Sequence, residues 1–257
     1  MGILVGKVPD TGVDGCGDAM TEEFGPACAT AAGAGPSVYA RLSTLKHERA
    51  NFFAMGKGEA TRGAILDEAV DVASRVGLEG LTVAGLADAT EMSKSGLFAH
   101  FRSKEELQLQ TLARARERFI DLVVRPALQG ERGLPRVRAV MDRWLLWAEQ
   151  LSGGCIFVAA SAELDDRPGP LRDALVRAER DWLELLAAVA ATAIAEDHFR
   201  PDVDPDQFAF EMHGVMLGLH HASRLLEEPK AHERARTALQ RLIESALAHD
   251  APVASAG

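Results

Sequence analysis

Apolar residues recur at helical spacing along most of the chain after residue 57. The first stripe includes Ile65, Leu66, Ala69 and Val72, and it stops at Gly77. Positions three, four and seven apart lie on one face of an α-helix, and glycine is typical of the position just after a helix ends. The pattern therefore predicts an amphipathic helix that ends at Gly77.

Two short helices follow, each preceded by a residue whose hydroxyl can accept a hydrogen bond from the first turn. Thr82 is the expected cap of the first helix, and Ser93 is the expected cap of the second, which carries apolar residues as far as Phe101. A tight turn through residues 90–92 joins them. The segment from Thr82 to Phe101 thus has the length and order of a helix-turn-helix.

A fourth helix is expected to begin after Ser103. Ser103 and Glu106 have the spacing of a capping box, in which the serine accepts from the Glu106 N–H and the glutamate reaches back. We expect this helix to run to Arg125, because Pro126 disfavours a helical conformation in the residue before it.

The second half of the chain continues the helical pattern. Helices are expected over about 135–151, 155–164, 170–196, 205–226 and 231–249. The last two carry apolar stripes, namely Phe208, Met212, Val215, Met216 and Leu219, then Leu239, Leu242, Ile243, Ala246 and Leu247. No segment has the alternation of a strand, so we predict an all-α fold.

The segment before the first stripe has a different composition. Residues 1–54 are rich in Gly, Ala, Thr and acidic residues and have no sustained apolar period, so we expect a disordered N-terminal extension. Met55 stands just before the periodicity begins. Our hypothesis is that Met55 is the true start of the protein.

Charge and cysteine content restrict the class of protein. The formal net charge is −10, which argues against non-specific coating of nucleic acid but leaves room for a local cluster of donors that binds phosphates. No apolar run approaches the roughly 20 residues of a membrane-spanning helix. Cys16, Cys28 and Cys155 have irregular spacing and suit a reducing cytoplasm better than a disulfide framework or a zinc site.

The residues of the predicted helix-turn-helix resemble those of a known family. Leu86-Ala87, the run from Ser93 to Phe101, and the run Ser103-Lys104-Glu105-Glu106-Leu107 resemble the DNA-binding domain of the TetR family of bacterial regulators. The resemblance covers about residues 57–119. Three positions depart from the family pattern: Phe98 replaces the usual Tyr, Glu91 a common glycine, and Ser95-Gly96 a more usual Gly-Thr.

The resemblance implies a three-helix DNA-binding domain over 58–118, with its helix-turn-helix at 82–101, and a helical ligand-binding and dimerisation domain over 127–250. The expected DNA-binding residues are Arg62, Thr82, Ser93, Lys94, Ser95, Gly96, Phe98, His100 and Lys104.

Individual positions in this set have a chemical interpretation. Lys94 and Ser95 lie in the first turn of the recognition helix, where side chains reach base edges, and Gly96 lets the backbone approach the groove. Phe98 lacks the hydroxyl that would donate to a phosphate, so we interpret it as a packing residue. Lys104 is a cation in the first turn of a helix, which opposes the helix dipole unless a phosphate docks there.

The predicted ligand pocket rests on large and polarizable side chains, which suit a small hydrophobic effector. The expected lining residues are Trp144, Trp147, Phe157, Trp182, Met212 and Met216. Three histidines, His213, His220 and His221, are expected to make polar contacts at the pocket mouth or the dimer seam rather than to bind a metal. The sequence indicates no cofactor.

These expectations combine into one functional prediction. The chain is predicted to be a cytoplasmic, homodimeric repressor that binds a palindromic operator in double-stranded DNA and is released by a small ligand. An activator of the same family, or a helical dimerising protein that has lost DNA binding, are the alternatives. An enzyme is disfavoured because the sequence has no glycine-rich phosphate loop, metal cluster or nucleophile–base set.

Overall fold

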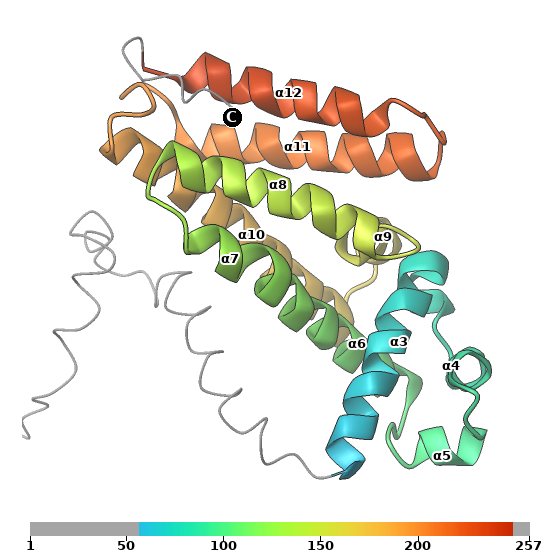
Figure 1. The fold of residues 1–257 in the computed structure, drawn as a ribbon. Helices are drawn as coiled ribbons and strands as arrows, with labels where there is room; N and C mark the ends of the chain where they lie inside the picture. The colour runs from blue at the N-terminus through green and yellow to red at the C-terminus, as the bar shows by residue number, and fades with distance from the viewer. Residues whose placement is uncertain (1–56, 249–257) are drawn as a thin grey trace, which may run out of the picture.

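The computed structural model describes residues 57–248, and these form a bundle of α-helices (Figure 1). Within this range there is no β-strand, only an isolated bridge between Phe199 and Leu247. The predicted all-α class is therefore confirmed. The expected N-terminal extension, Met55, Cys16 and Cys28 lie outside the described residues.

The first three helices of the described residues make a small unit at one end of the bundle (Figure 1). They are α3 (Lys57–Gly80), α4 (Val83–Thr90) and α5 (Lys94–Phe98). Helix α3 is broken at Gly77, whose φ of 77° lies in the left-handed region, so the regular helix ends where the sequence predicted and one further turn follows.

Both predicted helix caps of this unit are present. The Thr82 hydroxyl accepts a hydrogen bond from the Gly85 N–H at 3.0 Å, and the Ser93 hydroxyl accepts from the Gly96 N–H at 3.1 Å. Because each cap satisfies an N–H that the helix cannot pair itself, both short helices are fixed at their first turns. Leu86 and Leu97 are fully buried, and α4 packs against both α3 and α5.

Helix α6 (Lys104–Phe119) begins at the predicted capping box. The Ser103 hydroxyl accepts from the Glu106 N–H at 3.0 Å, as expected. The Glu106 carboxylate also reaches back, but it accepts from the N–H of Arg102 at 3.0 Å, one residue before the cap. The capping box thus joins the first turn of α6 to the turn that follows α5.

The prediction that Pro126 ends this helix is wrong. The helical path continues through a π-helical turn (Ile120–Val124) and a short helix α7 (Arg125–Leu128). The Arg125 N–H donates to the carbonyl of Ile120, five residues back, which widens the turn and changes the hydrogen-bond register before the proline. Pro126 then lies in the first turn of α7, where a missing N–H costs little.

The remaining helices form the larger part of the bundle. They are α8 (Leu134–Gln150), α9 (Ile156–Leu164), α10 (Pro170–Ala195), α11 (Pro205–Arg224) and α12 (Ala231–Ala246). Helices α11 and α12 lie side by side, far from α5 (Figure 1). No helix in the described part of the chain is long and apolar enough to cross a membrane.

The apolar stripes of α11 and α12 serve mainly the protein's own core. Phe208, Met212 and Leu219 of α11 and Leu239 and Ile243 of α12 are all buried within the single chain. These stripes are therefore buried without a partner protomer. A different face of α11 is open to solvent: Phe210 is 70% exposed and Leu217 is 39% exposed.

Candidate DNA-binding site and ligand cavity

Helix α5 presents one polar face and one buried residue. Lys94 and Ser95 are exposed, whereas Leu97 is fully buried in the core. The Ser95 hydroxyl lies 3.1 Å from the hydroxyl of Ser93, and a Cβ added to Gly96 would lie only 3.2 Å from that same capping oxygen. The first turn of α5 is therefore tightly packed around the cap, with Lys94 and Ser95 free to face a partner.

Phe98, at the end of α5, does not pack in the core. Its side chain is 57% exposed, so the interpretation of Phe98 as a packing residue is wrong for this chain. The physical reason is that Leu97 takes the inward position of this turn, and adjacent residues on a helix point in different directions. Phe98 instead adds an apolar group to the same surface that carries Lys94 and Ser95.

The turn between α4 and α5 has an acidic residue in a conformation that favours glycine. Glu91 has φ 53° and ψ 27°, the left-handed helical region, and its N–H donates to the Ala87 carbonyl at the end of α4. The glycine expected from the family pattern would adopt this conformation without the steric cost of a Cβ.

The other expected DNA contacts make hydrogen bonds or ring contacts within the protein. The Lys104 ammonium donates to the main-chain carbonyl of Glu79 at 2.6 Å, and Arg62 donates to the side-chain oxygen of Gln110 at 2.7 Å. The His100 ring lies beside Phe101, with 6.3 Å between the ring centroids. Thr82 is exposed and serves as a cap.

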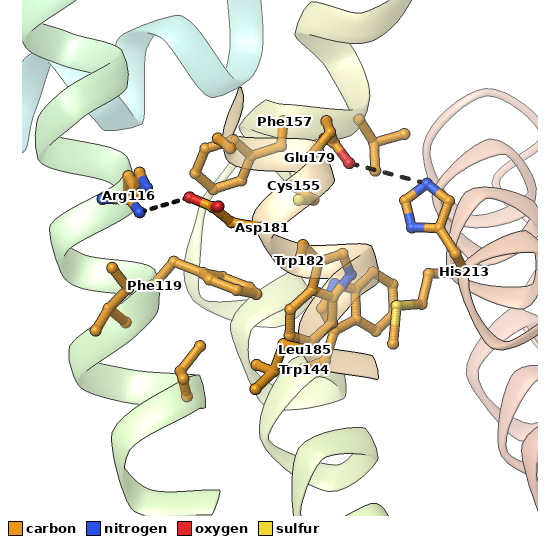
Figure 2. Close-up of a pocket in the computed structure, with 15 residues that line it drawn as sticks. Arg116, Phe119, Trp144, Cys155, Phe157, Glu179, Asp181, Trp182, Leu185 and His213 are labelled. Atoms are coloured by element: carbon orange, nitrogen blue, oxygen red, sulfur yellow. Dashed lines mark hydrogen bonds and ion pairs between the residues drawn. The ribbon is translucent and has the colours of Figure 1, made fainter. Parts of the chain in front are cut away.

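A cavity lies between α6, α8, α9, α10 and α11 (Figure 2), and part of its space of about 580 Å³ is open to solvent. Its aromatic wall consists of Phe119, Phe157, Trp144 and Trp182, and the Phe119 ring packs edge-on against Trp182 with centroids 4.9 Å apart. Edge-to-face packing fixes the orientation of such rings.

Four of the six expected pocket residues line this cavity: Trp144, Phe157, Trp182 and Met216. Trp147 and Met212 do not, and both are fully buried core residues. Trp147 packs edge-on against the outer side of the aromatic wall through Phe119, at 5.4 Å between centroids. It supports the wall without facing the cavity.

Two polar pairs also line the cavity, and sequence reasoning missed most of them (Figure 2). Arg116 of α6 donates to the Asp181 carboxylate at 2.9 Å, and His213 Nε2 lies 3.9 Å from Glu179 Oε2. His213 was expected at the mouth of a pocket or at a dimer seam. The available signal was helical spacing, because Glu179 stands three residues before Trp182, and Arg116 three before Phe119.

Burial shifts the pKa values of Glu179 and His213. Desolvation raises the pKa of Glu179 to about 7, and desolvation lowers the pKa of His213. Both shifts favour the neutral form of each side chain. Burial also raises the pKa of the Cys155 thiol, which lines the same cavity and stays protonated.

Helix α9 connects the cavity to α3. Its start contributes Phe157 to the cavity, while the loop before it docks on α3 through Gly153, whose N–H donates to the Ser74 hydroxyl at 3.0 Å. At its other end, the Glu163 carboxylate accepts from the Glu79 N–H at 3.1 Å. A displacement of α9 in the cavity would therefore be transmitted to the C-terminal end of α3.

The histidines of the described helices do not stand in a cluster with metal-binding partners. Within residues 57–248, no group of three or more His, Cys, Asp or Glu side chains could hold a metal ion.

Comparison with known proteins matches both halves of the chain. Residues 65–111 match the family of bacterial regulatory proteins described as tetR, and residues 133–239 match the C-terminal domain of tetracyclin repressor-like proteins. The HTH-type transcriptional regulator TcmR of Streptomyces glaucescens is 33% identical over 150 residues, which span 55% of this chain and 65% of TcmR. The match therefore covers a little less than two thirds of that relative.

Solved structures share the fold. A TetR transcriptional regulator from Chloroflexus aurantiacus superposes with a TM-score of 0.68 at 29% identity, covering 75% of this chain and 98% of that one. AibR, in complex with isovaleryl coenzyme A and operator DNA, gives a TM-score of 0.56 at 22% identity over 72% of this chain and 98% of its own. Together with the helix-turn-helix geometry, these matches show that the chain belongs to the TetR family of transcriptional regulators.

Proposed function

We propose that the protein is a cytoplasmic repressor that binds a palindromic operator in double-stranded DNA as a homodimer. In this proposal α5 enters the major groove, and a small ligand in the cavity releases the protein from DNA. Residues 58–118 form the DNA-binding domain, and residues 127–250 form the domain that binds ligand and dimerises.

The single observation that carries the proposal is the course of α6. The helix starts at the cap that follows α5, and twelve residues after Lys104 it places Arg116 in the wall of the cavity. A ligand that prefers one position of Arg116 and Phe119 would therefore move α6. The start of α6, which follows α5, would move with it. Coupling between two such sites is typically about 1–3 kcal/mol.

The proposed DNA-binding surface is centred on the exposed face of α5. Lys94 and Ser95 stand at the helix start, the position from which a recognition helix reaches base edges. Arg62, Thr82, His100 and Lys104 are proposed to contact the DNA backbone around it. Phosphate contacts of this kind set affinity and orientation, while the α5 residues set sequence preference.

The proposed dimer interface is the open face of α11. Phe210, Gly214, Leu217 and Gly218 recur at helical spacing, and the two glycines have no atom within 4 Å of an added Cβ. An exposed phenylalanine beside two glycines allows a second α11 to approach closely and bury the apolar side chains. Two protomers joined this way would present two copies of α5 to adjacent turns of DNA.

One structural neighbour, solved with a ligand and DNA, supports the proposal that one protein of this fold binds both. AibR was solved with isovaleryl coenzyme A and operator DNA, so this fold holds both an effector and DNA in that protein. For the present chain the aromatic cavity is the proposed effector site.

The test is a gel shift at fixed salt with DNA from upstream of the protein's own gene, together with light scattering for mass. We expect a shift of a palindromic fragment by a dimer, and Phe210→Asp should yield monomers and lose the shift. Leu226→Asp is the control, because Leu226 is 62% exposed but lies after the end of α11, outside the proposed face. Failure to shift any fragment at low salt would support a dimerising protein without DNA binding. A reporter that falls when the gene is deleted would support the activator alternative.

A further inference from the structure

Glu179 is the charged group of the cavity that has no close counter-ion. The other acid, Asp181, is neutralised by Arg116 at 2.9 Å. Within the part of the chain that the structure describes, Glu179 pairs with His213 alone, at 3.9 Å, and its side chain is only 23% exposed. A carboxylate in such a place is largely removed from water and has no hydrogen-bonded cation.

The titratable groups around Glu179 leave the cavity negative when this carboxyl is ionised. They are Arg116 of α6, Asp181 of α10, Cys155 at the start of α9 and His213 of α11. The arginine and aspartate cancel, and the buried thiol is neutral. One negative charge therefore remains, and it is Glu179.

The cavity that Glu179 lines also has an aromatic wall. Trp182 lies one turn further along α10, and Trp144 and Phe119 complete the wall on the same cavity (Figure 2). The face of an aromatic ring carries negative charge density, so it attracts a cation, and tryptophan does so most strongly. A carboxylate and tryptophan side chains in the wall of one cavity are an arrangement that can recognise positive charge on an apolar body.

Resting on the proposed function, we propose that the effector is a lipophilic organic cation, such as an N-alkylated heteroaromatic ring or an aromatic ammonium. Its positive charge lies against Glu179, and its apolar part lies among Phe119, Trp144 and Trp182. An anion is disfavoured by the carboxylate, and a plain hydrocarbon leaves the carboxyl unpartnered.

The pH dependence of binding follows from the same group. The pKa of Glu179 is raised to about 7, so the carboxyl is mostly protonated at pH 6 and mostly ionised at pH 8. Affinity for a cation of fixed charge should therefore rise about tenfold between these pH values. The lowered pKa of His213 acts in the same direction, since its protonation at low pH adds a repelling charge.

The experiment compares two probes of the same shape by calorimetry on the full chain without DNA. N-methylquinolinium has a fixed positive charge and no titrating group, and 1-methylnaphthalene is its neutral isostere. At pH 8 we expect wild type to bind the cation at least tenfold more tightly than the isostere, with the preference falling about tenfold at pH 6.

Two variants locate the preference. Glu179→Gln keeps the shape of the neutral side chain, so it should retain affinity for 1-methylnaphthalene and lose the preference for the cation. Asp173→Asn removes a charge of the same sign from an exposed position of α10 outside the cavity, and it should behave as wild type. Equal affinities for the two probes, no binding of either, or an unchanged preference in Glu179→Gln would each overturn the inference.

A gel shift without added probe on the same preparations keeps the two proposals apart. If the wild-type protein shifts the operator but does not prefer the cation, only the proposed class of effector is rejected. If the wild-type protein prefers the cation but does not shift the operator, only the proposed function as a DNA-binding regulator is rejected.

Discussion

The ammonium of Lys104 donates a hydrogen bond to the main-chain carbonyl of Glu79, with 2.6 Å between Nζ and oxygen. Lys104 begins α6, where a cation opposes the helix dipole, but Glu79 stands at the C-terminal end of α3, where a cation is favourable. The same side chain also lies 3.6 Å from the Glu79 carboxylate. One lysine thus joins the end of α3 to the start of α6.

Lys104→Met should separate the structural contribution of this lysine from its proposed contact with phosphate. Methionine keeps much of the apolar stem and removes the charge. Because Lys104 is about half exposed, we expect unfolding free energy to fall by no more than about 1 kcal/mol. Operator affinity should fall about equally on all sequences, and the slope of log affinity against log salt should decrease by about 1.

Lys94→Ala should affect operator binding differently from Lys104→Met. Lys94 is exposed at the start of α5, so its loss should also narrow the difference in affinity between the operator and a scrambled fragment. Unchanged salt dependence in Lys104→Met would mean that the lysine only joins the two helices. Unchanged discrimination in Lys94→Ala would remove that residue from base readout.

Local features of the fold could be predicted from sequence because their causes are local. The caps at Thr82, Ser93 and Ser103 depend on a side chain and an N–H three residues later, so spacing alone is enough. The break at Gly77 depends on one residue with no Cβ. The course of the chain past Pro126 could not be predicted, because the π-turn at Ile120 changes the hydrogen-bond register over a whole turn.

The candidate site could be predicted only in its apolar part. Large side chains such as Trp144 and Trp182 are expected to be buried, and a cavity lined by them could therefore be predicted. The polar pairs depend on how three helices pack, since Arg116 is 65 residues from Asp181 in the chain. The interpretation of Phe98 as a packing residue rested on its missing hydroxyl, which does not determine the side of α5 on which the side chain lies.

Glu91→Gly should stabilise the protein. Glu91 holds a left-handed conformation that costs a non-glycine residue about 1 kcal/mol or more, part of which is offset by the greater entropy of glycine in the unfolded chain. The expected net gain in unfolding free energy is about 0.5 kcal/mol, measured by urea denaturation. Glu91→Ala is the control, because it removes the same charge and keeps the steric cost. If alanine and glycine stabilise equally, the backbone argument fails.

Gly153→Ala should disturb the docking of the α9 loop on α3. An added Cβ would lie 1.9 Å from the Ser74 carbonyl oxygen, a backbone atom that cannot rotate away. We expect a loss of about 1–3 kcal/mol in unfolding free energy, typical of overpacking, and a weaker effect of ligand on operator affinity. Gly130→Ala is the matched control, since the nearest atom to its added Cβ is 3.6 Å away. Unchanged ligand response in a destabilised Gly153→Ala would exclude this loop as a route of coupling.

Glu179 should make the folded state less stable as pH rises. Its pKa is raised from 4.5 to about 7, so the folded protein holds a proton that the unfolded chain releases more readily. The stability that this proton contributes is fully present below about pH 4.5 and is lost as pH rises through 7. The shift corresponds to about 3 kcal/mol between these limits.

Urea denaturation of wild type and Glu179→Gln at pH 5, 6, 7 and 8 measures this effect, with ionic strength and protein concentration held constant because a dimer's stability depends on concentration. The glutamine variant cannot release a proton here, so its stability relative to wild type should increase steadily across this range. The lowered pKa of His213 contributes with the opposite sign, since its stabilisation is lost as pH falls below 6.5. Because Glu179 pairs with His213, the difference between the two curves reports the titration of this pair, and curves that run parallel from pH 5 to 8 would show that the Glu179 carboxyl is not desolvated in the cavity.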